Sequence, residues 1–281
     1  MPFDLHAELR LGIASVLLAL AACGNEADDT AARGTDGEAV LAEAAPASQT
    51  DRDTAYTLIA RAVERQGLKA LDSAAVAFRF RDRAYRYQRV GGRFAYERVW
   101  VDTATGERVR DVLTNDTLVR LRDGIAEDLP EKRRRAFAGS VNSVIYFAFL
   151  PWALRDPGVA AVYEGRDTVG GRVLDRIAVT FPDAGEHADA YRYWLTPDGR
   201  ELPYLAYAHQ GSKAPRFREA FNARTVDGLA VRDYRNYTMP GKADADVATL
   251  ADRFGRGELE LLSVIALEEV RRVGVEEGSA F

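Results

Sequence analysis

The sequence predicts a mainly β protein of the α+β class. We expect one large curved antiparallel sheet, or half-barrel, of about a dozen strands, with an N-terminal helix and a helical lid. Apolar and polar residues alternate with a period of two over much of the chain, and turn signals such as Gly91-Gly92 separate these segments at spacings typical of hairpins. Two segments, 53–67 and 130–154, follow a helical pattern instead. A sheet of this size must close or cover its concave face, so we expect the helices to cover it.

The N-terminus is typical of a secretory signal that ends in a lipobox. Residues 11–22 carry no charge and are too few to span a bilayer, which takes about 20 apolar residues, but they suit the apolar part of a signal peptide. They lead into Leu-Ala-Ala-Cys, and Cys23 is the only cysteine in the chain. We therefore predict a signal peptide over 1–22, with cleavage before Cys23 and lipidation of Cys23 with palmitate. The alternative is an ordinary signal peptide with a cysteine at its cleavage site by chance.

Residues 23–52 are predicted to be the lipidated cysteine and a disordered tether. The segment is rich in Ala, Asp, Glu, Gly, Thr and Ser and holds no aromatic residue. Gly24 follows Cys23, where many Gram-negative lipoproteins that stay in the inner membrane have Asp, and this favours the outer membrane, with the domain in the periplasm. Residues 53–281 then form a single half-barrel domain, which we expect to be a monomer.

Composition excludes several classes of function. The net charge of −5 gives no positive field to attract nucleic acid. Once Cys23 is acylated no thiol remains, and outside the signal His187 and His209 are the only imidazoles, so we expect no metal site, no cofactor and no His-based triad. The chain also lacks a phosphate loop, a dinucleotide glycine fingerprint and a nucleophile elbow.

The elements follow the pattern in order. Asp51 or Asp53 is placed to cap the first helix, and Gly67 to end it. Period-two strands follow, a helical insertion ends before Pro151, and residues 246–254 form a second short helix. Residues 259–270 fit either a strand or a helix. The strands are marked by alternating residues near 78–81, 85–89, 94–100, 173–181, 191–195 and 217–221.

The arginine-rich strands are the sharpest local feature. They suit a face that binds an anionic group, with guanidinium forks between aromatic walls. They also suit the solvated face of an ordinary sheet, with the arginines paired to acids on neighbouring strands. Arg218 belongs to a later strand of the same alternating type. The early arginines are Arg79, Arg81, Arg83, Arg86, Arg89, Arg93 and Arg98.

The apolar end of the second helix carries Tyr146, Phe147 and Phe149. These aromatic side chains suit either a core or a lid over an apolar groove. We predict that they point into the concave side, because this helix is the only long apolar cover in the sequence. An anionic headgroup at the rim would then be bound by an arginine such as Arg79, Arg81 or Arg218.

Several segments resemble a family of bacterial lipoproteins of unknown function, over nearly all of 53–270. Some members carry a sugar-phosphate aldolase label, but this sequence has no pattern of a parallel α/β barrel. More remotely, the layout resembles the periplasmic lipoprotein-carrier (LolA/LppX-like) fold, in which a concave cavity holds acyl chains; this resemblance alone does not fix function. The segments that carry the family resemblance are 76–82, 111–116, 140–144, 204–207, 216–220, 222–228 and 257–263.

The sequence therefore predicts a lipid-anchored envelope protein, not an enzyme, that binds a lipid or another amphipathic ligand in its concave cavity. The first alternative is a scaffold or partner-binding lipoprotein of the outer membrane without a small ligand. The second alternative is an enzyme of unknown type.

Overall fold

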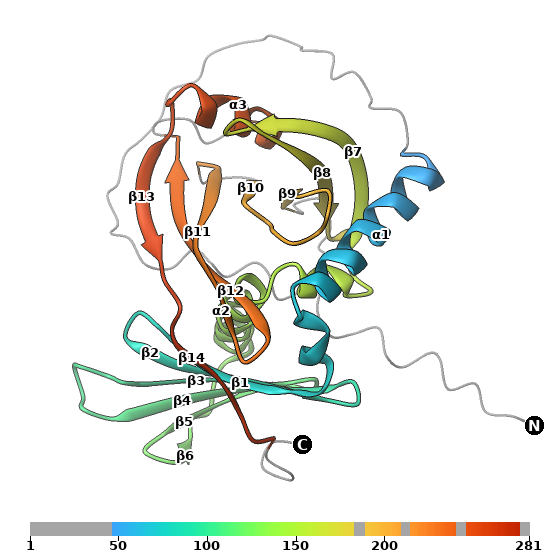
Figure 1. Ribbon diagram of the computed structural model, residues 1–281. Coiled ribbons are helices and arrows are strands. Elements are labelled where there is room, and N and C mark those ends of the chain that lie inside the picture. Colours follow the sequence, from blue (N-terminus) through green and yellow to red (C-terminus); the bar gives the residue numbers. More distant parts are fainter. Residues whose placement is uncertain (1–46, 183–188, 209–213, 240–245, 276–281) are drawn as a thin grey trace, which may run out of the picture.

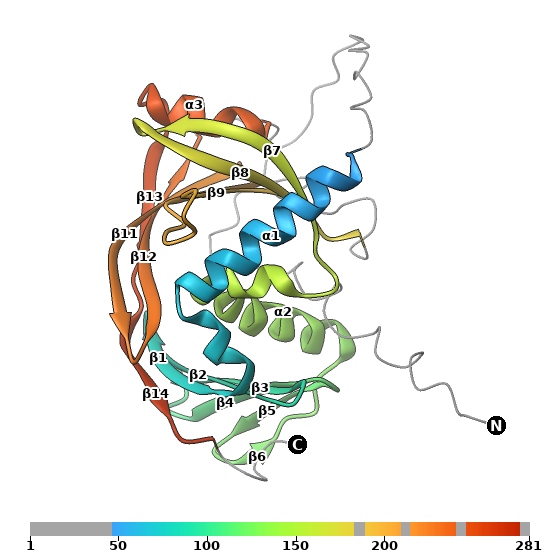
Figure 2. The ribbon, with the colours of Figure 1, turned by 45° about the vertical axis from the view of Figure 1, so that its right-hand side comes forward.

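The computed structural model describes residues 47–182, 189–208, 214–239 and 246–275. These residues form two seven-stranded antiparallel sheets that curve around two helices, α1 and α2 (Figures 1 and 2). The two sheets do not close into a barrel. The predicted fold class, mainly β with a curved antiparallel sheet, is confirmed, although the strands divide between two sheets.

The first sheet holds the arginine-rich strands. Its strand order is β14-β1-β2-β3-β4-β5-β6, so neighbours in sequence are neighbours in space except at β14. Its strands are β1 (Ala75–Phe80), β2 (Arg83–Val90), β3 (Arg93–Val101), β4 (Arg108–Thr114), β5 (Leu118–Arg122), β6 (Ile125–Ala126) and β14 (Glu268–Val273).

The second sheet is a meander in the order β13-β12-β11-β10-β9-β8-β7. The glycine pair at 170–171 forms the turn between β7 and β8, as its hairpin spacing predicts. The sheet comprises β7 (Ala160–Val169), β8 (Arg172–Thr180), β9 (Ala190–Leu195), β10 (Tyr204–Ala208), β11 (Arg216–Val226), β12 (Leu229–Thr238) and β13 (Glu260–Ile265).

The segment at 259–270, which fits a strand or a helix in sequence, forms the strands β13 and β14. β13 pairs with β12 in the second sheet, and β14 pairs with β1 in the first. This segment therefore carries the chain from one sheet to the other, along the outer wall seen in Figure 2.

Helix α1 (Gln49–Arg65) crosses the open side of the second sheet (Figure 2). It begins four residues before the predicted start at 53, because the Ser48 side chain caps it by accepting a hydrogen bond from Asp51 N. The chain leaves the helix at Gly67, which has a left-handed φ of 70°. A Cβ at this position would overlap the carbonyl oxygen of Gly228 in the β11–β12 turn, so only glycine allows this close approach.

Helix α2 (Glu131–Ala148) lies between the two sheets (Figure 2). Ala138, Val141 and Ile145 are buried along one stripe with helical spacing. Pro151 follows the helix, as predicted, and a short 3-10 helix, Trp152–Arg155, comes next. α2 and the faces of both sheets share one continuous apolar core.

The far face of the second sheet is also covered. Trp194, Tyr204 and Phe217 form a second buried cluster there, together with Leu250 of α3 (Leu250–Gly255). The predicted short helix over 246–254 is therefore present as α3 and the 3-10 turn Val247–Thr249 before it. It covers apolar area that the curved sheet would otherwise expose.

Candidate functional site

The three aromatic residues predicted on the lid helix point into the concave side. The hydroxyl groups of Tyr146 and Tyr193 lie 3.0 Å apart and share a hydrogen bond. Phe147 packs against Tyr207, with 5.5 Å between ring centroids, and Phe149 packs against the first sheet. α2 thus fills the space between the sheets and links them through aromatic contacts.

This packing corrects one expectation. The sequence led us to expect a concave cavity large enough for an acyl chain, but side chains of α1, α2 and both sheets fill the concave side among the described residues. One pocket beside α2 has a cavity volume of about 30 Å³, which is room for about two water molecules. A single aromatic-rich helix occupies the space that a ligand tail would need.

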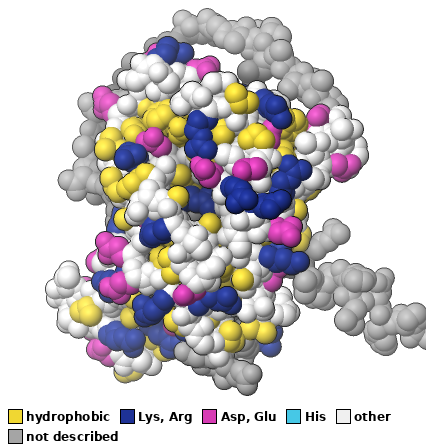
Figure 3. All heavy atoms as spheres, viewed as in Figure 1, with side chains coloured by type: hydrophobic (Ala, Val, Ile, Leu, Met, Phe, Trp, Pro, Cys, Tyr) yellow, Lys and Arg dark blue, Asp and Glu magenta, His cyan; other side chains and the backbone are white. Residues whose placement is uncertain are grey.

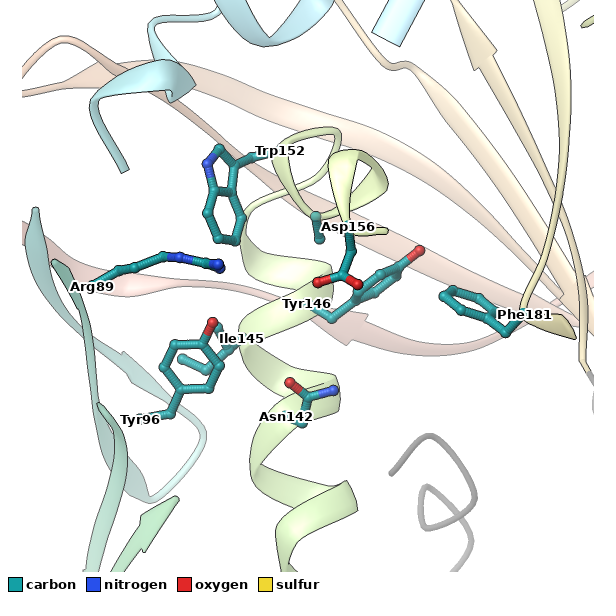
Figure 4. Close-up of a pocket in the computed structure, with 9 residues that line it drawn as sticks. Arg89, Tyr96, Asn142, Ile145, Tyr146, Trp152, Asp156 and Phe181 are labelled. Carbon is teal, nitrogen blue, oxygen red and sulfur yellow. The ribbon is translucent and has the colours of Figure 1, made fainter. Parts of the chain in front are cut away.

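This pocket lies where α2 meets both sheets and the 3-10 helix (Figure 4). Apolar walls surround a small number of polar groups, which is the usual composition of a binding pocket. Its lining residues are Arg89, Tyr96, Asn142, Ile145, Tyr146, Trp152, Ala153, Asp156 and Phe181.

Two opposite charges face this pocket. The Arg89 side chain extends between Trp152 and Tyr96 (Figure 4), and its guanidinium carbon lies 5.2 Å from the centre of the Trp152 ring. The Asp156 carboxylate lies across the pocket and accepts a hydrogen bond of 3.1 Å from Gly158 N. Neither charged group has an ion-pair partner within 4 Å among the described residues.

Burial dominates the titration of the groups around the pocket. It raises the pKa of the Asp156 carboxyl, and the hydrogen bond from Gly158 and the charge of Arg89 only partly oppose this shift. It also raises the pKa of the Tyr96 hydroxyl, although Arg89 lowers it in part. The pKa of Tyr146 is raised well above its usual value by burial and by Tyr193. The pocket thus disfavours negative charge except beside Arg89.

Arg218, predicted at the rim, lies inside the core beneath α2. It is 6% exposed, its Nη2 donates to the Tyr207 hydroxyl at 2.8 Å, and its guanidinium lies 4.1 Å from the centre of the Phe147 ring. No carboxylate lies within 4 Å of it in the described part of the chain. The structure therefore joins Arg218 and Phe147, as the sequence suggested, but at a buried position.

Arg79 and Arg81 are not brought to the pocket. Arg79 points to the face of β1 opposite the buried Phe78, and its Nε lies 3.9 Å from Glu269 Oε1 on β14. Arg81 is exposed in the β1–β2 turn, with a left-handed φ of 56° and its guanidinium over the Phe80 ring. Cys23, the predicted lipidation site, lies outside the described residues.

Sequence reasoning included Arg89 in the arginine-rich stretch without singling it out, and it missed Asp156. A signal for Arg89 was available. Side chains alternate between the two faces of a strand, so Arg83 and Arg89 share the face of the buried Tyr85 and Tyr87. Asp156 directly follows the short 3-10 helix after Pro151. The sequence there has no strand or helix periodicity from which the direction of its side chain could be predicted.

The described residues include no group of three or more His, Cys, Asp or Glu side chains that is able to hold a metal ion. In the same part of the chain, no helix is both long and apolar enough to cross a membrane.

Comparisons with known proteins place this fold among several solved structures at low identity. One is a domain described as an outer membrane lipoprotein-sorting protein domain from Vibrio parahaemolyticus, with 10% identity, a TM-score of 0.44, and coverage of 80% of this chain and 95% of that chain. A DUF1329 family protein from Desulfovibrio piger has 9% identity, a TM-score of 0.36, and coverage of 79% and 95%. The Mycobacterium tuberculosis lipoprotein LppX has 14% identity, a TM-score of 0.25, and coverage of 55% and 89%.

Two of these three solved proteins are described as lipoprotein-related. No curated protein matches the sequence. The model of a family of unknown function, DUF6503, matches residues 55–266, which is most of the chain and nearly all of the described fold. The chain therefore belongs to the DUF6503 family.

Proposed function

We propose that this protein is a lipid-anchored envelope protein that binds an amphipathic ligand without catalysis, with the polar group of the ligand in the Arg89–Asp156 pocket. The observation that carries the proposal is that two opposite charges face one small pocket without an ion-pair partner in the described residues. Both side chains are half-buried, and a charged group that loses part of its hydration gains from an opposite charge beside it. A ligand that brings both charges supplies the missing partners.

The chemistry of the two groups defines the ligand. Arg89 presents a planar guanidinium fork that suits a phosphate or carboxylate, and Asp156 suits an ammonium group. A zwitterionic lipid headgroup carries both. Tyr146 and Phe181 continue the pocket wall on its apolar side, where the first part of an acyl chain would pack.

A ligand with a long chain requires α2 to move, since the pocket as it stands has room for about two water molecules. The aromatic contacts of Tyr146, Phe147 and Phe149 are then replaced by contacts with the chain. α2 is a discrete helix bounded by Pro130 and Pro151, so it is able to move without breaking a strand pair.

Native mass spectrometry of the full-length protein, extracted from membranes in mild detergent, tests this proposal. We expect a co-purifying amphipathic molecule on the wild-type protein and its loss from Arg89→Gln. Arg172→Gln is the matched control, because it removes one arginine of the second sheet, whose side chain is 41% exposed and pairs with Glu201. Equal occupancy in wild type and Arg89→Gln, or no co-purifying molecule at all, contradicts the proposal.

The filled concave side favours a second candidate, a partner-binding envelope protein without a small ligand. β13 is an edge strand whose Leu261, Leu262 and Val264 side chains are each more than half exposed, and hydrophobic side chains gather over this region in Figure 3. Exposed apolar edges pair readily with strands of other chains. If the wild-type protein extracted in detergent carries no non-covalently bound lipid in native mass spectrometry, that result supports this second candidate.

A further inference from the structure

A second group of arginines lies on the concave face of the first sheet, at the end near the first half of α2. Arg98 on β3 and Arg120 on β5 are 3% and 5% exposed, and both bind the carboxylate of Asp111, which is fully buried. Arg98 Nε donates to Asp111 Oδ2 at 3.0 Å, and Arg120 Nε donates to Asp111 Oδ1 at 2.7 Å. The second nitrogen of each fork also donates to this carboxylate.

The charges in this group do not balance. Two buried guanidinium groups share one carboxylate, so this group of three side chains carries a net positive charge. A second group on the same sheet has the opposite imbalance, because three carboxylates bind Arg122; in the described residues these carboxylates form no ion pair with Arg98 or Arg120. These acids are Asp102, Glu107 and Glu127. An uncompensated charge in a buried site is costly.

The group opens to solvent on one side, at Trp100 and Arg83. Trp100 is half-buried, and three guanidinium carbons lie over its ring: Arg83 at 4.6 Å, and Arg98 and Arg120 each at 5.2 Å. About a third of the Arg83 side chain is exposed. Its Nε lies 3.7 Å from Oδ1 of the exposed Asp82, which makes a long ion pair. Contact with an indole ring restricts the orientation of the planar guanidinium groups that lie over it.

Donors remain available around this ring. Arg120 Nη1 forms no hydrogen bond in the described part of the chain, and the same holds for the whole guanidinium of Arg83. Arg98 Nη1 is held by the Ser140 hydroxyl on α2, at 2.7 Å. An oxyanion beside Trp100 would accept hydrogen bonds from Arg83 and Arg120 and neutralise the excess charge.

We propose that Arg83 and Arg120, with the charge of Arg98 beside them, form around Trp100 a binding site for a phosphate-type oxyanion, whether free or on a lipid headgroup. The site is separate from the Arg89–Asp156 pocket, shares no lining residue with it and does not depend on the proposed function. It rests on the charge imbalance at Asp111 and on the free donors beside a half-buried indole ring.

Isothermal titration calorimetry and tryptophan fluorescence of the folded protein test the site, with two probes. The probes are inorganic phosphate and monomeric dihexanoyl phosphatidic acid, each compared with chloride at equal ionic strength. We expect one bound anion and a fluorescence change that Trp100→Phe abolishes, while Trp152 and Trp194 stay in place. Arg83→Gln should weaken binding by about tenfold or more, the usual loss for a charge-assisted hydrogen bond.

Arg83 is suited to this test because it does not bind Asp111, so its loss leaves the buried network intact. Arg172→Gln, which removes an arginine of the second sheet, should bind as wild type does. Binding of inorganic phosphate supports a site for free oxyanions, and binding of the lipid probe alone supports a headgroup site. Absence of binding by both probes, or equal affinities of wild type and Arg83→Gln, overturns the proposal.

Discussion

The hydroxyl oxygens of Tyr146 on α2 and Tyr193 on β9 lie 3.0 Å apart and share a hydrogen bond inside the core. Both side chains are buried, at 7% and 0% exposure. This bond ties the helix that fills the concave side to the second sheet. It therefore contributes to holding α2 in place between the sheets.

Removing this bond should destabilise the protein. Tyr146→Phe and Tyr193→Phe should each lower the free energy of unfolding by about 1–2 kcal/mol, because each leaves a buried hydroxyl without its partner. The double variant should cost less than the sum of the two single variants. Urea unfolding followed by circular dichroism measures all three. Additive losses would show that the two hydroxyls do not interact.

Asp156→Asn should stabilise the protein at neutral pH. Burial raises the pKa of the Asp156 carboxyl in the folded state, so the unfolded chain releases this proton at a lower pH than the folded one. The contribution of Asp156 to stability is therefore intact below its unfolded pKa and falls as pH rises through the folded pKa. Asparagine does not ionise and retains the acceptor for Gly158 N.

The expected gain in Tm at pH 7 is about 2–4 °C, as for ~1 kcal/mol in a domain of this size. At pH 3 wild type and Asp156→Asn should melt together, and differential scanning calorimetry at both pH values makes the comparison. A variant that is less stable than wild type at pH 7 would mean that the ionised carboxylate is favourably bound, with Arg89 as its partner.

The buried tyrosines should make the fold sensitive to alkali. Burial raises the pKa of Tyr87, Tyr191 and Tyr193, with like charges on neighbouring groups adding to the shift for Tyr87 and Tyr191. Above a pH of about 10 the unfolded chain loses these protons and the folded chain keeps them. Stability should therefore fall steeply as pH rises from 10 to 12, in urea titrations at fixed ionic strength. A flat profile over this range would contradict the assigned burial.

Gly67 should tolerate no side chain. Gly67→Ala places a methyl group against the Gly228 carbonyl at a left-handed φ, and we expect a loss of about 3 kcal/mol or more. Gly91→Ala is the matched control: its φ is also positive, at 57°, but nothing lies within 4 Å of the added Cβ. It should lose about 1 kcal/mol, the cost of backbone conformation alone. Similar losses in the two variants would show that α1 and the β11–β12 turn are not in close contact.

Cys23→Ser should release the protein from membranes or leave its signal peptide uncleaved. Two or more acyl chains anchor a protein stably, at ~0.8 kcal/mol per buried methylene, whereas a protein without them stays in solution. Fractionation of cells that express wild type or Cys23→Ser, with immunoblotting, measures this. A variant that is still cleaved before residue 23 and remains with the membrane would show that Cys23 is not the anchor.

The sequence by itself determined the local structure. Alternation of apolar and polar residues placed the strands, because side chains of a strand face opposite sides in turn, and Gly67 and Pro151 marked the ends of the helical segments, because glycine adopts a left-handed φ and proline cannot continue a helix. The direction of Tyr146, Phe147 and Phe149 followed from the need to cover apolar area.

The tertiary structure decided everything that depends on distant pairs. Alternation sets Arg89 and Arg98 on the faces of buried aromatic residues, but the pairing of β2 with β3 and with β1 brings these faces together on one side of the sheet. The meeting of Arg89 with Asp156, across 67 positions of sequence, depends on how α2 and the 3-10 helix pack between the sheets. The empty volume on the concave side depends on the same packing. It is the small difference between two large volumes, the space that the curved sheets enclose and the space that the side chains occupy.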